Sequence, residues 1–428
     1  MEVHVIATET IKPSSPTPPH LRTFKISLLD QMNIDGHFPL MLFYSGACEN
    51  TTKTSDHLKK SLAKTLTHYY PFAGRVKGNL SIDCDDTGAS FIEANVSCKM
   101  SDILDQLESD QLEKLLPFKD NKLKLYTGGI MVVVQANYFS CGGVAISIYF
   151  KHVIADAFAG AIFVKRWAAI ACDGSNRIEG AVYGCASIFP PQDLPLQRLW
   201  RKSFVNNVSL GDAITKRFIF DDTTIATLRE TIVNGPCLNR PTRFEAVAAL
   251  IWGAAIAAGR EREDFKAKNV ALIPVSLRHK INMASPEQCI GNVGQAAIAK
   301  WPTEKMIDYN SLAAKLHEAI MMMDENYARK LNEGGGFLND LRELDEGIGD
   351  SNVFFLTSMF RSPLYEADFG WGKPKWANSV MNFNNFIFCS DTCSGGGIEA
   401  WVGLPKEDMQ RFEKNPHIVA YASFKPSI

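Results

Sequence analysis

The chain has 428 residues, of which 46% are hydrophobic and 21% charged, and its formal net charge is -2. This composition is typical of a soluble globular protein and excludes the disordered and fibrous classes, while the length predicts two domains of about 200 residues, or three. The near-neutral charge, without long clusters of Lys and Arg, argues against a nucleic-acid partner.

The sequence also argues against export, membrane insertion and metal binding. The first residues, M-E-V-H-V-I-A-T-E-T, lack the basic region and apolar run of a secretory signal. Apolar stretches such as 246–258 are shorter than the roughly 20 residues that cross a bilayer, so we expect a cytoplasmic protein without a membrane partner. The ten cysteines include no CxxC pair, so neither a metal site nor a disulfide framework is expected.

Apolar runs with strand character come first in the chain. They occupy 24–30, 38–44 and 128–139 and are rich in β-branched or aromatic residues. Between them, residues 55–69 carry apolar side chains at the spacing of an amphipathic helix, namely Leu58, Leu62, Leu66 and Tyr69.

The second half of the chain repeats this mixture after an irregular segment. Residues 174–210 contain Gly and Pro and little periodicity, so we expect a first domain at 1–190, a linker at 191–210 and a second domain at 211–428. Thr242 and Glu245 fit a capping box ahead of the apolar run A-V-A-A-L-I-W and predict a helix start. Strands and helices mix in both halves, so the predicted fold class is mixed α/β.

One histidine and one aspartate stand four residues apart in the apolar stretch K-H-V-I-A-D-A-F-A-G at 151–160. Strand parity over 144–152 places His152 on the same face as Phe150. Residues 157–171 have helical spacing, so Asp156 is expected to be the N-cap of a helix. A histidine at such a strand end tends to stay neutral and can accept a proton as a general base.

A second motif, D-F-G-W-G-K-P, occupies 368–374. Its two glycines, Gly370 and Gly372, predict a rigid loop that needs glycine torsions and presents the indole N–H of Trp371. HxxxD in mid-chain and DFGWG near the end resemble the BAHD family of plant acyl-CoA-dependent acyltransferases. Further matches, such as L-D-Q at 29–31 and Y-P-F-A-G-R at 70–75, extend the resemblance over essentially the whole chain, most strongly to the branch that acetylates alkaloid alcohols.

The resemblance implies a fold and a set of roles. The fold would consist of two similar-sized domains, related to chloramphenicol acetyltransferase, with a channel between them and DFGWG in the second domain. His152 would be the general base, and Asp156 would pair with Arg278 to hold the histidine in place. The family usually has an asparagine where this chain has Ser276, which removes one hydrogen bond that would support Arg278.

The resemblance also extends to the DFGWG motif and to the binding sites. Asp368 would support its loop, and Trp371 would either donate to the tetrahedral oxyanion or serve only in packing. The chain has no phosphate-binding glycine loop, so acyl-CoA would bind at the helix start formed by Arg240, Thr242 and Arg243, which could equally be a solvated basic turn. Candidate acceptor-pocket residues, which core packing explains almost as well, are His37 in the segment 33–38, and Phe383 and Asn385 in the run N-F-N-N-F at 382–386.

We therefore expect a monomeric O-acyltransferase that uses acyl-CoA, most simply acetyl-CoA, to acylate an alkaloid or terpenoid alcohol without a metal. Two alternatives stay open. The same fold could transfer benzoyl or hydroxycinnamoyl groups, or acylate an amine. It could also serve as a non-catalytic ligand-binding protein.

Overall fold

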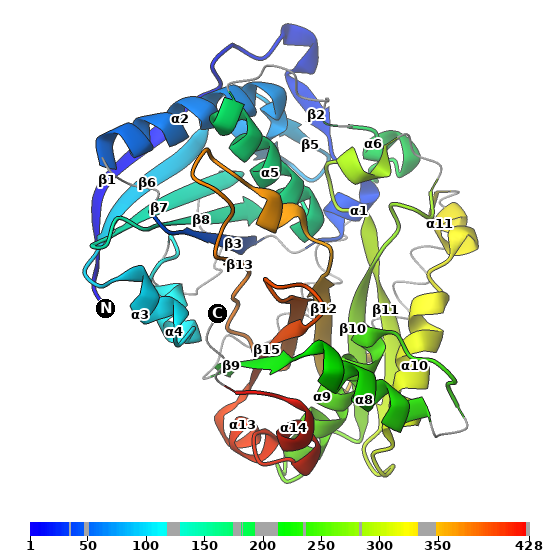
Figure 1. Cartoon of the computed structure of the whole chain (residues 1–428). Helices are drawn as coiled ribbons and strands as arrows, with labels where there is room; N and C mark the ends of the chain where they lie inside the picture. Colours follow the sequence, from blue (N-terminus) through cyan, green and yellow to red (C-terminus); the bar gives the residue numbers. More distant parts are fainter. Residues whose placement is uncertain are drawn as a thin grey trace.

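The computed structural model describes residues 1–33, 36–46, 51–117, 129–173, 181, 183–192, 213–233, 237–281, 285–332 and 348–424. This part of the chain forms two six-stranded sheets, one above the other in Figure 1, with helices around them. The mixed α/β class is therefore confirmed. Within the same residues, no helix combines the length and the apolar character that crossing a membrane requires.

The first sheet has the strand order β1-β6-β7-β8-β3-β13. A smaller sheet, β2-β5-β4, lies in the same half. The strands of both sheets are β1 (Val3–Ile11), β2 (Thr23–Lys25), β3 (His37–Tyr44), β4 (Arg75–Lys77), β5 (Ser81–Asp83), β6 (Ala89–Val96), β7 (Val132–Phe139), β8 (Val144–Lys151) and β13 (Trp376–Asn378). The helices of this half are η1 (Pro19–Leu21), α2 (Thr51–His68), η2 (Tyr70–Ala73), α3 (Met100–Leu104), α4 (Ser109–Glu113) and α5 (Ala157–Asp173).

Helix α5 packs closely on the first sheet. Every residue of β3 and β8 is buried, because both faces of these strands are covered. Gly160 of α5 lies flat on the sheet, since a Cβ there would stand 3.2 Å from the Phe150 ring and 3.3 Å from the Phe38 ring. This contact holds the start of α5 at the ends of β3 and β8.

The second sheet has the order β11-β10-β12-β14-β15-β9. Its strands are β9 (Ala213–Phe220), β10 (Lys268–Ser276), β11 (Gly294–Pro302), β12 (Asn352–Met359), β14 (Phe386–Asp391) and β15 (Ile398–Pro405). The remaining helices are α1 (Leu28–Gln31), α6 (Cys185–Ile188), α8 (Asp222–Val233), α9 (Arg243–Gly259), η3 (Pro286–Gln288), α10 (Tyr309–Met321), α11 (Glu325–Asn332), η4 (Pro363–Glu366), α13 (Lys406–Phe412) and α14 (Pro416–Tyr421).

Alternate residues of the second sheet belong to two different cores. Leu272 and Phe355 pack with the first sheet, whereas their neighbours Ile273 and Leu356 pack with α9 and the other helices of the second half. Because side chains alternate along a strand, one face of this sheet meets its own helices and the other meets the first sheet. Both faces are apolar, as a sheet covered on two sides requires.

Two segments cross between the two halves of the chain. Strand β13 pairs with β3, so the segment that carries DFGWG joins the first sheet instead of the second domain; it is the orange segment beside α5 in Figure 1. Conversely, the α1 residues Leu28 and Leu29 pack in the second core, and the strand expected over 24–30 ends at Lys25. Most of the expected linker at 191–210 lies outside the described residues.

Candidate active site

His152 lies at the corner where β8 gives way to α5. Its backbone N–H donates to the carbonyl of Gly36 at 2.8 Å, and its ring packs against Phe38 with the centroids 5.0 Å apart. Asp156 closes the corner as the predicted N-cap of α5, since its Oδ1 accepts from the N–H of Ala159 at 2.8 Å. The strand-to-helix corner predicted from the sequence is thus confirmed.

A hydrogen bond to Asn292 defines the tautomer of His152. The Nδ1 of His152 lies 3.0 Å from the Oδ1 of Asn292. The Nδ2 of Asn292 lies 2.8 Å from Asp30 Oδ1 and 2.6 Å from the His152 carbonyl, and both of these oxygens are acceptors. Because the amide nitrogen must face these acceptors, Oδ1 faces the ring, so Nδ1 of His152 carries the proton and Nε2 keeps a lone pair.

The surroundings of His152 favour its neutral form. Burial lowers the pKa of the imidazole below its ordinary value of 6.5, and this effect outweighs the neighbouring Asp156 carboxylate. The residue nevertheless remains partly accessible to solvent, so it borders a space that water can enter. A neutral imidazole with a free lone pair beside such a space can accept a proton from a bound molecule.

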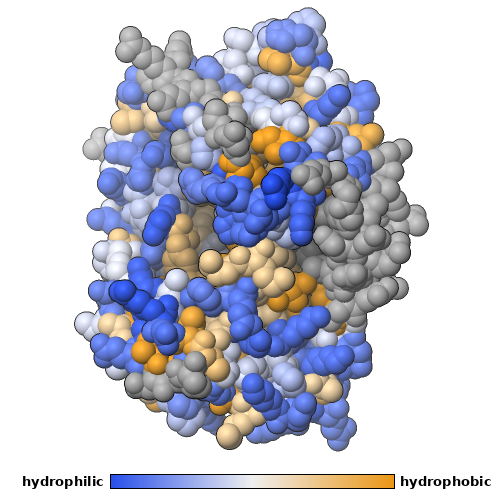
Figure 2. Space-filling model, turned by 90° about the vertical axis from the view of Figure 1, so that its right-hand side faces the viewer, coloured by the Kyte–Doolittle hydropathy of each residue, from blue (hydrophilic) through white to orange (hydrophobic). Residues whose placement is uncertain are grey.

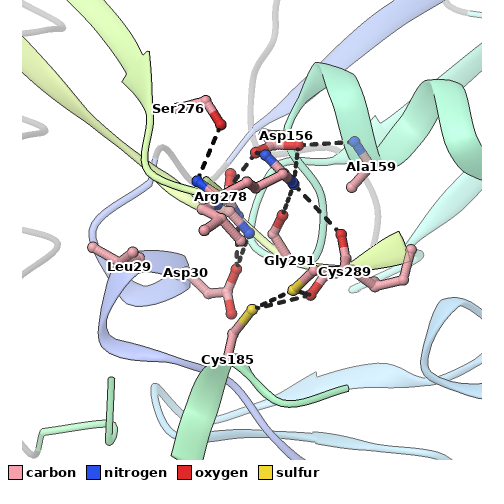
Figure 3. A network of polar contacts seen from close by, with 12 residues as sticks. Leu29, Asp30, Asp156, Ala159, Cys185, Ser276, Arg278, Cys289 and Gly291 are labelled. Carbon is pink, nitrogen blue, oxygen red and sulfur yellow. Dashed lines mark hydrogen bonds and ion pairs between the residues drawn. The ribbon is translucent and has the colours of Figure 1, made fainter. Parts of the chain in front are cut away.

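The predicted ion pair between Asp156 and Arg278 is confirmed (Figure 3). The two guanidinium nitrogens donate to the two carboxylate oxygens at 2.7 and 2.9 Å, a bidentate geometry. Arg278 also donates to the Gly291 carbonyl at 3.1 Å and stacks on Phe158, with its guanidinium carbon 4.9 Å from the ring centre. Burial alone would raise the pKa of Asp156, but Arg278 and the N–H donors lower it, so the pair stays ionised.

Ser276 leaves this ion pair intact. It lies exposed at the end of β10, and its Oγ is 3.4 Å from the backbone N–H of Arg278. The support of Arg278 therefore comes from Asp156, the Gly291 carbonyl and Phe158 rather than from a side chain at position 276.

The DFGWG loop is held from within. Asp368 Oδ1 accepts from the N–H groups of Gly370, Trp371 and Gly372 at 2.8, 3.0 and 2.9 Å. Gly370 and Gly372 have φ values of +96° and +88°, which side-chain-bearing residues rarely adopt. The predicted loop and its need for glycine torsions at positions 370 and 372 are confirmed.

Trp371 packs among aromatic rings at the far end of β3. Its ring stacks on Phe369 and meets Tyr44 edge-on, both at 5.7 Å. Tyr44 is six residues from Phe38 along β3, or about 20 Å in an extended strand, and Phe38 is the residue that touches His152. These contacts place the indole against Tyr44 rather than beside Phe38 and His152, which favours the packing role over the oxyanion role.

The residues expected to anchor acyl-CoA lie at the N-terminus of α9, where Thr242 is the N-cap. Thr242 and Glu245 make the predicted capping box, with Oγ1 of Thr242 3.2 Å from the Glu245 N–H and the Glu245 carboxylate 2.7 Å from the Thr242 N–H. Arg240 and Thr242 are exposed, whereas Arg243 donates to the carbonyls of Gly396 and Gly397. Arg240 and the helix start are thus open to an anion, and part of the Arg243 side chain is occupied by the β14–β15 turn.

The three candidate acceptor-pocket residues lie in different local surroundings. His37 is buried, on the opposite face of β3 from Phe38, and its Nε2 bonds the Ile130 carbonyl at 2.9 Å. Phe383 packs on Phe386 in the core between the sheets. The Asn385 carbonyl accepts from the Phe355 N–H at 2.8 Å, and its backbone is left-handed with φ of +55°.

One face of the molecule is hollowed. Figure 2 shows a recess near its middle that hydrophobic residues border in part. Within the described residues, no group of three or more His, Cys, Asp or Glu side chains could hold a metal ion. Nine cysteines in this part of the chain are free thiols.

Sequence reasoning missed Asn292 and assigned no role to Asp30. Asn292 follows η3 in the loop I-G-N-V-G at 290–294, where only its flanking glycines mark it. Asp30 belongs to the L-D-Q motif, which contributed to the family resemblance without a function attached. Both residues reach His152 only through the folded chain, because Asn292 is 140 and 262 positions from His152 and Asp30 respectively.

Comparison with known proteins gives consistent matches over the whole chain. The model of the Transferase family matches residues 1–418. The chain is 45% identical over 450 residues to the limonoid 1-O-acetyltransferase of Citrus sinensis and 45% identical over 434 residues to the limonoid 21-O-acetyltransferase of the same species, with 100% of each chain covered. Among solved structures, vinorine synthase matches with a TM-score of 0.83 and 30% identity over 99% of both chains.

Proposed function

The chain belongs to the BAHD transferase family, and on this premise we propose that it transfers an acetyl group from acetyl-CoA to a hydroxyl group of a limonoid-type triterpenoid. Family membership makes it an acyltransferase with an acyl-CoA co-substrate. The acetyl donor and the limonoid acceptor rest on the two Citrus sinensis relatives, which match over their full length. Their names differ in the acetylated position, so either position 1 or position 21 is open.

The observation that carries the proposal is the free Nε2 of His152. In the reaction this nitrogen accepts the proton of the acceptor hydroxyl while the oxygen attacks the thioester carbonyl. The tetrahedral intermediate then collapses, the carbon–sulfur bond breaks, and the imidazolium returns the proton to the CoA thiolate. The histidine ends the cycle neutral, and no group is left on the protein.

Asp156 supports this step without touching the substrate. Its carboxylate is committed to Arg278, the Ala159 N–H and, at 3.2 Å, the Val293 N–H. The ion pair ties the α5 corner that carries His152 to the end of β10 and the loop that carries Asn292. We therefore assign Asp156 and Arg278 to holding the site together.

For acyl-CoA, we propose that its phosphates lie at the start of α9. The exposed Arg240 and Thr242, the partly exposed Arg243 and the positive end of a 17-residue helix favour an anion there. Replacement of Arg240 by Ala should raise the KM for acetyl-CoA but not for S-acetylpantetheine, which lacks the nucleotide phosphates. Equal effects on both donors would refute this anchor.

For the acceptor, we propose that it reaches His152 through a channel between the two sheets, with the recess of Figure 2 as a candidate entrance. Phe383, in the apolar core between the sheets, and Asn385 are candidates for contact with the triterpenoid skeleton. We further propose a monomer, because His152, Asn292, Asp156 and Arg278 all come from one chain. A cytoplasmic location fits the free thiols, which are typical of reducing compartments.

The proposal is tested by incubating the protein with acetyl-CoA and a panel of limonoid alcohols free at position 1 or 21, with alkaloid alcohols and amines as a second panel. Thiol release and a mass gain of one acetyl group on a limonoid are expected, and both should vanish with His152→Ala. Benzoyl-CoA and hydroxycinnamoyl-CoA are the competing donors. Turnover only of an alkaloid, an amine or a larger acyl group would refute the assignment, and binding without turnover would favour a non-catalytic role.

A further inference from the structure

Asp30 is a buried carboxyl group that the proposed chemistry does not yet use. It is the third residue of α1 and only 2% exposed. Its Oδ2 lies 2.9 Å from the Ser27 N–H and 2.7 Å from the Ser27 hydroxyl, so part of its role is the capping box of α1. Its other oxygen, Oδ1, accepts instead from the N–H and Nδ2 of Asn292 at 2.7 and 2.8 Å.

The backbone around Asn292 permits this close approach. Gly291 has φ of +117°, and a Cβ at this position would stand 3.3 Å from one carboxylate oxygen of Asp30. Figure 3 shows Asp30 on α1 directly below the loop that contains Gly291. Asp30 and Asn292 are 262 positions apart in sequence. Asp30 Oδ1 nevertheless accepts from both the backbone N–H and the side-chain Nδ2 of Asn292.

The orientation of the Asn292 amide controls which nitrogen of His152 is free. In the observed orientation Oδ1 of Asn292 accepts from Nδ1–H, and Nε2 is available. If the amide turned over, its NH2 group would face Nδ1, the ring proton would move to Nε2, and the base would be lost. The acceptors that oppose this turn are Asp30 and the carbonyl of His152.

We propose that Asp30 is a positioning residue for acyl transfer, which holds the Asn292 amide so that the His152 proton stays on Nδ1 and Nε2 is free for the acceptor hydroxyl. This role rests on the proposed function of His152 as general base. The other titratable groups packed around the chain of contacts are the Asp156–Arg278 pair, bonded to Val293 and Gly291, and the thiols of Cys185 and Cys289. The ion pair is already committed, and the thiols bond each other and the Ile290 carbonyl rather than Asn292.

The first test separates positioning from helix capping. Asp30→Ala removes the Asp30 half of the capping box and the contact with Asn292, whereas Ser27→Ala removes the Ser27 half of the box and keeps the contact. We expect kcat to fall by about 100-fold in Asp30→Ala with little change in either KM, because the base is lost rather than the binding surface. Ser27→Ala should stay within about threefold of wild type, and Asp30→Asn, whose Oδ1 can still accept from Asn292, should recover most of the loss. The activity assays are run below the unfolding temperature of every variant, which is measured by circular dichroism. Equal losses of kcat in Asp30→Ala and Ser27→Ala would overturn the proposal.

The second test does not depend on turnover. Nitrogen-15 NMR of histidine-labelled protein, with the His152 signal assigned by its loss in His152→Ala, reports the tautomer directly. Wild type should carry the proton on Nδ1, and Asp30→Ala should shift signal toward the Nε2–H tautomer. An unchanged tautomer in Asp30→Ala would overturn the role of Asp30 even in an active enzyme, whereas the expected shift in a protein that acetylates none of the alcohols would refute only the proposed function.

Discussion

Replacement of Arg278 by Met should destabilise the protein by about 3–5 kcal/mol. The Arg278 side chain is 4% exposed and that of Asp156 is 23% exposed, so the pair is largely shielded from water. Without Arg278, the Asp156 carboxylate keeps only the N–H groups of Ala159 and Val293 as donors and lies uncompensated in a site that disfavours charge. Methionine fills much of the same volume, so the loss reports the charge pair more than a cavity.

The assay is urea unfolding followed by intrinsic fluorescence, for Arg278→Met, Asp156→Asn and the double variant. If the two charges stabilise each other, the double variant should lose less than the sum of the two single variants, by about 2 kcal/mol or more. Arg278→Lys is the matched control, because it keeps the charge but loses the two-point contact, and it should fall between wild type and Arg278→Met. Two results would refute the reasoning. One is a loss of unfolding free energy below about 1 kcal/mol in Arg278→Met, which is the level of a surface ion pair. The other is a double variant whose loss equals the sum of the two single losses.

Three further predictions concern the base, the tryptophan loop and the contact between the sheets. Because burial lowers the pKa of His152 below 6.5 and the neutral form is the base, kcat/KM for the acceptor should fall as the pH drops through a midpoint that lies below 6.5. A midpoint at 6.5 or above in the pH profile would contradict this. Trp371→Phe keeps the stacking but loses the N–H, so kcat should change by less than about threefold, whereas the loss of an oxyanion donor costs about 10²–10³-fold. Glu399 is 2% exposed, accepts from the indoles of Trp376 and Trp401, and pairs with Arg217 at 3.1 Å. Glu399→Gln should therefore lower the free energy of unfolding in urea by about 3–5 kcal/mol. A loss under about 1 kcal/mol would show that the pair contributes little.

Features encoded by neighbouring residues were predictable from the sequence. The capping box of α9 needs only Thr242 and Glu245, and the N-cap of α5 needs only Asp156 ahead of a helical pattern. The glycine torsions of the DFGWG loop follow from the same local logic. The ion pair with Arg278 was predictable only through the family resemblance, since 122 residues separate its partners.

Features that depend on distant contacts were not predictable in this way. The three strand residues of β13 carry too little pattern to reveal that they extend the first sheet. Trp371 stands in a motif that presents an indole, and only the folded position of Tyr44 shows where that indole lies. Asn292 bonds His152 across 140 residues, and an isolated asparagine between glycines has no local property that indicates this contact.

The pairing of β13 with β3 limits how chains of this family can be recombined. A chimera joined between residues 190 and 213 would bring a foreign edge strand to the first sheet, where Trp376 packs edge-on against Phe43 at 5.5 Å. In such a chimera Trp376 would face a β3 strand from another parent, whereas its buried hydrogen bond to Glu399 would join residues of the same parent. Exchange of acceptor specificity between relatives by swapping halves therefore requires that residues 363–380 come from the same parent as the first half, which makes four segments of alternating parentage rather than two.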